Sequence, residues 1–160
     1  LDAGLEPDSI GYLGAGRYAA VAGYGHATDR SAAMVELTGP DLELEPTEDV
    51  TSERSGATVT VTSPHHSDDD EYDEPATLTV TRSDALPDHT LIREQVMRRR
   101  YRALRNTLSF FESGVDTVHL RSDTRVVDRT LGYERTPTVF ELDGQAYRAE
   151  ASVEGSASDR

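Results

Sequence analysis

The chain has 160 residues, which is enough for one domain with a core of its own. Its 30 Asp and Glu residues outnumber 16 basic residues, all of them Arg, so the formal net charge is −14. The absence of cysteine excludes a disulfide framework and thiolate chemistry, and no apolar run is as long as a membrane-spanning helix.

The excess of acid predicts a protein adapted to a salt-rich cell interior. A large net charge repels itself at low ionic strength, whereas molar salt shortens the Debye length to about 3 Å. Arg is more weakly hydrated than Lys and pairs with carboxylates through two hydrogen bonds. A GC-rich genome would explain the missing Lys but not the surplus of acid. We therefore expect a halophilic, cytoplasmic protein that requires high salt for stability.

Two short strands are predicted near the start of the chain, over residues 18–26 and 32–37, joined by a polar loop. Residues 46–55 are polar, and we expect them to be exposed.

The clearest predicted hairpin comes next, with strands over residues 57–62 and 76–81. Both strands alternate Thr with apolar residues, which is typical of a sheet with one dry face and one wet face. The segment between them, residues 63–75, is strongly acidic, and we expect it to form an exposed loop.

One long amphipathic helix is predicted between residues 90 and 113, a segment without Pro or Gly. Asp88 can cap its start, and Gly114 is suited to its end. Its apolar stripe, with spacings of four and three residues, consists of Met97, Tyr101, Leu104, Leu108 and Phe111.

A strand over residues 115–121 should follow, and then a short helix over residues 124–131. Ser122 or Asp123 can cap that helix, and Gly132 can end it.

Two final strands are predicted over residues 137–142 and 145–153, around an Asp143-Gly144 turn. The element order predicts an α/β (α+β) fold with a mixed, largely antiparallel sheet. One long and one short helix should pack on one face of that sheet. We expect a single domain over residues 1–153 and a flexible tail over residues 154–160.

A basic stripe lies opposite the apolar stripe of the long helix and consists of Arg98, Arg99, Arg102 and Arg105. Such a stripe could bind nucleic acid or an acidic protein surface. The alternative is that these arginines pair with carboxylates of the chain itself, and high salt also weakens phosphate binding.

Arg100 differs from these four, because it falls at the edge of the apolar stripe, where a charge needs a partner. We expect that partner to be Asp123, which gives a structural Arg100–Asp123 pair.

No metal site is predicted. The acidic loop holds two His and several Asp and Glu residues that could ligate a divalent cation, but they lack the spacing of a known calcium loop. We interpret this run as a solvated loop and expect no cofactor.

The centre of the chain combines a Tyr-x-Ala-Leu pattern at residues 101–104 with a Ser-Asp-Thr sequence at residues 122–124. Over about residues 94–132 this arrangement resembles the ribonuclease H-like superfamily. The resemblance implies antiparallel strands, then the helix, a strand and a short helix. It carries a catalytic position over to Asp123 alone.

The departures from that family affect its chemistry. The family's helical Glu falls on Arg100, its first-strand Asp has no counterpart, and its last carboxylate cannot be placed. Two-metal phosphodiester hydrolysis needs several carboxylates around the cations. The resemblance therefore implies a ribonuclease H-like fold that binds rather than cuts.

Residues 114–142 also resemble the end of acetyl-coenzyme A N-acetyltransferases, through Leu131-Gly132-Tyr133-Glu134 before a final strand. That family has a Gly-rich pyrophosphate loop before its long helix, whereas residues 83–92 contain no Gly. Our first hypothesis is accordingly a non-catalytic binding or assembly domain. The alternative is an enzyme, either a metal-dependent nuclease with a rearranged site or an acetyl-CoA-dependent N-acetyltransferase-like protein.

The charge balance predicts a strong dependence of stability on salt. Raising KCl from a dilute buffer to molar concentration should raise the midpoint temperature of unfolding, because salt screens the repulsion of a chain with net charge −14. Thermal unfolding followed by circular dichroism at several KCl concentrations measures this. A midpoint that stays constant or falls would contradict adaptation to salt.

Overall fold

The computed structural model describes residues 13–21, 32–47, 49–63, 74–98 and 101–153. The chain divides into two compact units, Leu1–Glu43 and Leu44–Arg160, where the sequence predicts one domain over residues 1–153. Most of the predicted acidic loop and all of the tail over residues 154–160 lie outside the described residues.

The first unit contains an antiparallel pair of strands, β1 (Gly16–Val21) and β2 (Ala32–Leu37). Tyr18 of β1 lies opposite Val35 of β2. The pairing of these two segments confirms the predicted strands, although β1 begins two residues earlier than expected and residues 22–26 are not described.

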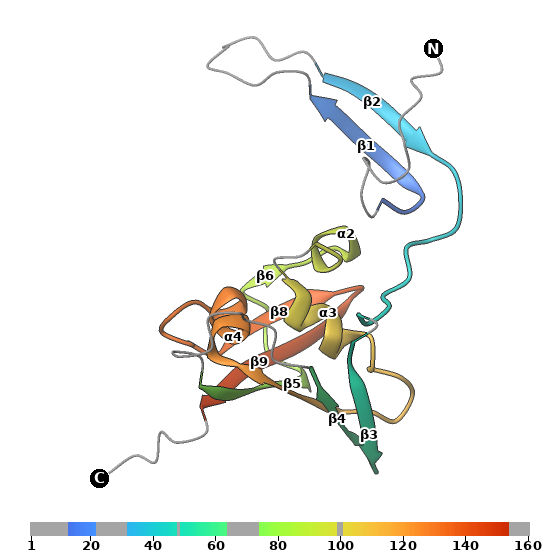
Figure 1. Cartoon of the computed structure of the whole chain (residues 1–160). Helices are drawn as coiled ribbons and strands as arrows, with labels where there is room; N and C mark the ends of the chain where they lie inside the picture. Colours follow the sequence, from blue (N-terminus) through green and yellow to red (C-terminus); the bar gives the residue numbers. More distant parts are fainter. Residues whose placement is uncertain (1–12, 22–31, 48, 64–73, 99–100, 154–160) are drawn as a thin grey trace. The chain divides into compact units, whose positions relative to one another are not determined.

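The second unit is built on a seven-stranded sheet in the order β3-β4-β7-β5-β9-β8-β6 (Figure 1). Two neighbouring pairs, β4 with β7 and β6 with β8, are parallel, and the other pairs are antiparallel. The mixed, largely antiparallel α+β fold is therefore confirmed. The strands are β3 (Thr51–Ser55), β4 (Thr58–Thr62), β5 (Pro75–Ser83), β6 (His89–Thr90), β7 (Thr117–Asp123), β8 (Thr138–Leu142) and β9 (Gln145–Val153).

The two Thr-alternating strands, β4 and β5, do not pair with each other. Strand β7 lies between them, parallel to β4 and antiparallel to β5, so the predicted hairpin over residues 57–62 and 76–81 is wrong. The buried side chains of β7 explain its position, since Val118 and Leu120 are both fully buried. A strand whose alternate side chains are this deeply buried gains most in the middle of a sheet, where its backbone is also paired on both sides.

The single long helix is also wrong, because the segment forms two short helices, α2 (Arg93–Val96) and α3 (Arg102–Leu108). A run of arginines, residues 98–100, separates them, and the first turn of α3 has no acidic residue. Like charges three and four residues apart on a helix repel, which disfavours one continuous helix across this run.

Asp88 does not cap a helix as predicted. Its carboxylate accepts a hydrogen bond of 2.9 Å from the backbone N–H of Val139, and Ile92 holds the N-cap position of α2. Asp88 thus ties the chain before α2 to strand β8.

The third helix, α4 (Thr124–Leu131), agrees with the sequence in detail. Asp123 is its N-cap and accepts a hydrogen bond of 2.7 Å from the N–H of Val126. Gly132 is its C-cap, at φ +80°. The β8–β9 hairpin is confirmed as well, with Asp143 and Gly144 both at positive φ, as a two-residue turn of this kind requires.

The core lies on one face of the sheet, and α3 and α4 cover that face (Figure 1). Leu104 and Leu108 of α3 and Val127 of α4 belong to the same buried cluster as the apolar side chains of the central strands. In that cluster the sheet residues with no measurable exposure are Val61, Leu78, Val80, Val118, Leu120 and Ala149. None of the helices in the described part of the chain is long and apolar enough to cross a membrane.

Candidate functional site

A broad polar surface of the second unit is the face of its sheet opposite the helices. Alternation along each strand places apolar side chains toward α3 and α4 and mostly polar side chains on the other side. This surface extends onto β8, where Val139 lies opposite Arg148 and Glu141 lies opposite Ala146. We call the part on strands β3, β4, β7, β5 and β9 the threonine face. Its fifteen positions are Thr51, Glu53 and Ser55 of β3, Thr58, Thr60 and Thr62 of β4, Thr117, His119 and Arg121 of β7, Thr77, Thr79 and Thr81 of β5, and Arg148, Glu150 and Ser152 of β9.

The register aligns these positions in three rows across five strands. In the middle row Thr60 lies opposite His119, and His119 lies opposite Thr79. Glu53 and Glu150 end this row on strands β3 and β9. Because the rows follow from continuous pairing, the hydroxyl groups form a regular array.

Hydrogen bonds join neighbouring strands on this face. The Oγ1 of Thr79 lies 2.9 Å from Nδ1 of His119, and the hydroxyl oxygens of Thr81 and Thr117 are 3.4 Å apart. Such cross-strand pairs stabilise a sheet. They leave part of the hydrogen-bonding capacity of each hydroxyl for an outside partner.

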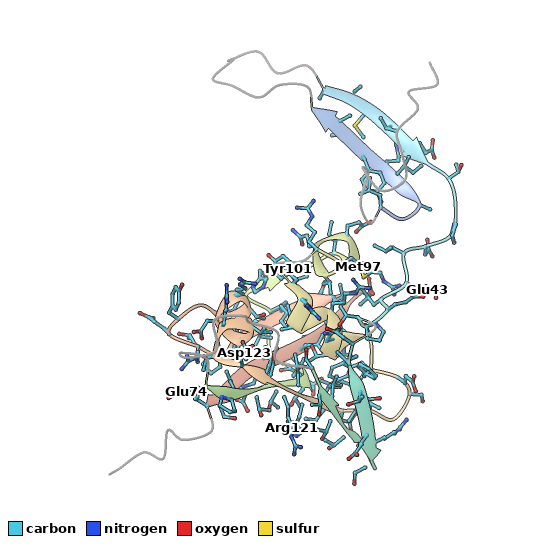
Figure 2. The ribbon with its side chains drawn as sticks, viewed as in Figure 1. Glu43, Glu74, Met97, Tyr101, Arg121 and Asp123 are labelled. Carbon is cyan, nitrogen blue, oxygen red and sulfur yellow. The ribbon has the colours of Figure 1, made fainter. Side chains whose placement is uncertain are left out.

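The fifteen positions of the threonine face carry no net formal charge and Glu141 on the adjoining part of β8 adds one negative charge, whereas the chain as a whole carries −14. The charges of Arg121 and Arg148 balance those of Glu53 and Glu150, and Arg148 lies 3.3 Å from Glu150. Figure 2 shows Arg121 projecting from the sheet on the side away from α3 and α4. The threonine face is therefore polar and close to neutral, with a half-buried centre at Thr60, His119 and Thr79.

Asp123, the position carried over from the ribonuclease H-like resemblance, lies at the end of β7 beside α4 (Figure 2). It is 4% exposed, and its carboxylate caps α4. Its neighbours Ser122 and Thr124 are buried too, and the N–H of Thr124 donates to the carbonyl of Glu74. Among the described residues, no group of three or more His, Asp or Glu side chains is placed to hold a metal ion.

The predicted Arg100–Asp123 pair and the predicted site residue Arg99 lie outside the described residues. Of the other predicted binding arginines, Arg98 is exposed at the end of α2.

Arg102 and Arg105 contact a segment of the chain itself. Arg102 forms an ion pair with Asp49, and the Nε of Arg105 donates to the backbone carbonyl of Glu45. The structure thus brings two of the four predicted binding arginines against residues 45–49, where Nη2 of Arg102 and Nε of Arg105 each bind an oxygen of that segment.

Asn106 of α3 anchors the same segment, a role that was not predicted from the sequence. The N–H of Thr47 donates to Oδ1 of Asn106 over 2.8 Å, and Nδ2 of Asn106 donates to the Thr47 hydroxyl over 2.9 Å. Asn106 is 1% exposed. The only signal available beforehand was an Asn inside a helix, where its propensity is poor.

Asp49 is held in its charged form by this arrangement. The hydroxyl of Thr47 lowers the pKa of the Asp49 carboxyl, burial partly opposes that shift, and Arg102 lowers the pKa further. The cluster of Thr47, Asp49, Arg102 and Asn106 fastens the chain before β3 to helix α3.

Arg82 joins the end of the sheet to residues that follow α3. Its Nε donates to the carbonyl of Val115 over 2.9 Å, and its guanidinium lies 5.3 Å from the ring centre of Phe111. Tyr147 stands beside Phe111 in an edge-on contact, and burial raises the pKa of its hydroxyl. These contacts assign Arg82 to the packing of the core.

Asp49→Asn should lower the free energy of unfolding at neutral pH by about 0.5–1 kcal/mol, as expected for a partly exposed ion pair. The pKa of Asp49 is lowered in the folded state, so its contribution is complete above the unfolded pKa and disappears as pH falls through the folded pKa. The stability curves of wild type and variant should therefore begin to converge as pH falls below about 4 and should meet only below the lowered pKa of the folded state. Urea unfolding across pH, with the exposed residue change Asp84→Asn as control, measures this; a difference that persists at acid pH would contradict it.

No family model, no curated protein and no solved structure matches the chain. The features of the chain that bear on function are therefore the threonine face of its sheet and the buried end of β7.

Proposed function

We propose that this chain is a non-catalytic binding or assembly domain of a halophile and that it binds another folded protein through the threonine face. The observation that carries the proposal is a neutral, hydroxyl-lined sheet face on a chain of net charge −14. In the described part of the chain, the helices gather on the opposite face. The charge balance also fits the cytoplasm of a cell that accumulates salt.

A protein partner suits this face better than a nucleic acid does. The cores of protein interfaces are depleted of charged residues, whereas nucleic-acid surfaces are strongly basic. The threonine face has as many acidic as basic side chains. Arg102 and Arg105 belong to the basic stripe that the sequence analysis considered for nucleic-acid binding. In the structure they contact residues 45–49 instead.

The position of Asp123 supports a non-catalytic role. Its carboxylate is almost fully buried and caps α4, so the cap by itself accounts for an acidic residue at this point in the chain. A ribonuclease H-like fold in which Asp123 serves structure remains part of this proposal.

Asp123→Ala separates the structural role from a catalytic one. We expect the variant to lose about 1 kcal/mol of unfolding free energy, the usual effect of removing a helix cap. Neither wild type nor variant should cleave labelled DNA or RNA in molar KCl with Mg²⁺ or Mn²⁺. Cleavage by the wild type that Asp123→Ala abolishes, and that the exposed change Asp116→Ala preserves, would establish a nuclease instead.

Photo-crosslinking tests the binding surface. A benzophenone side chain installed in place of Thr60, at the middle of the threonine face, should give a discrete adduct of higher mass in cells that express the chain. The matched control is the same group in place of Tyr133, which is 91% exposed after α4. No adduct at Thr60, or the same adducts at both positions, would refute the threonine face as a binding surface.

A further inference from the structure

We infer that the partner of the threonine face is a second copy of the same chain, packed sheet against sheet. This inference rests on the proposed function, because it takes the threonine face to be the binding surface. The hydroxyl groups and the charge distribution of the threonine face both favour a second copy of the chain as the partner.

The composition of the face makes it complementary to itself. A Thr or Ser hydroxyl both donates and accepts hydrogen bonds, so a surface of hydroxyl groups can pair with an identical surface. Most dimers use a two-fold axis, which brings the same patch of both subunits together. An interface made of one kind of charge could not do this, because each copy would repel the other.

The distribution of charge within the face has the form of a protein interface. Of the four formally charged residues, Glu53 and Glu150 end the middle row, Arg121 lies in an outer row, and Arg148 lies opposite Val139 of β8. The three interior positions are Thr60, His119 and Thr79. The absence of charge at this centre agrees with the cores of specific interfaces, which are depleted of charged residues.

Net charge restricts where two copies can meet. Two chains of −14 repel each other over most of their surfaces, and the repulsion is smallest where a face carries no net charge. The threonine face satisfies that condition because its two arginines balance its two glutamates. Molar salt screens the charges outside the contact.

The area of the threonine face lies at the lower limit for a specific dimer. Strands lie about 4.8 Å apart and alternate residues about 6.7 Å apart, so each position covers about 32 Å² of a flat sheet. Fifteen positions on each of two copies then bury about 1,000 Å², which is the lower limit for a specific interface. Two sheets pack face to face at about 10 Å, a separation that Thr side chains from both sides can fill.

Sedimentation velocity in molar KCl, over a range of protein concentrations, tests the inference. The wild type should sediment as a dimer, and Thr60→Glu should weaken self-association at least tenfold by placing an unpaired charge at the centre. The matched control is Thr136→Glu, an exposed position between α4 and β8, which should leave the dimer intact. A wild type that remains a monomer, or a dimer that Thr60→Glu leaves unchanged, would overturn the inference.

A second readout does not depend on the stability of the glutamate variant. The chain has no cysteine, so Thr60→Cys provides a single thiol for a flexible bis-maleimide crosslinker. Covalent dimer should form from Thr60→Cys and not from Thr136→Cys. Absence of that dimer, combined with a photo-adduct of Thr60 to a different protein, would overturn the second-copy partner while leaving the proposed binding function intact.

Discussion

The pairing of β7 with strands on both sides is the constraint on which the rest of the second unit depends. It runs parallel to β4 and antiparallel to β5, and its residues keep both neighbours in one register. Side chains alternate along a strand, so a slip of one residue would move the threonines into the core and the valines into solvent. One strand thus determines both the dry face and the threonine face.

The two ends of β7 connect this sheet to the helices. At its start, Arg82 binds the carbonyl of Val115 and stacks near Phe111, which follows α3. At its end, the strand passes directly into α4, with Asp123 as the cap. Asp123, the residue at the catalytic position of the ribonuclease H-like resemblance, therefore caps the helix at the point where the strand ends. This arrangement leaves the exposed face of the sheet as the better candidate for function.

Local signals predicted much of the fold. Alternation identified β4 and β5, the Asp143-Gly144 pair identified the β8–β9 hairpin, and Asp123 with Gly132 delimited α4. Pairing between distant strands could not be predicted in this way, because β4 and β5 alternate alike and a hairpin between them satisfies the same pattern. The edge strands β3 and β6 were missed, since all five residues of β3 are exposed and β6 has only two residues. The candidate site depends on that distant pairing. The threonines could be recognised in the sequence, but their alignment in rows across several strands could not be predicted from it.

The most direct test of this account is the connectivity of the sheet, measured by nuclear Overhauser effects in molar KCl. The account predicts backbone contacts from Thr60 to His119 and from His119 to Thr79, with no direct contacts between β4 and β5. Contacts that join β4 directly to β5 would restore the local hairpin. They would break the rows of the threonine face and contradict the proposed function with them.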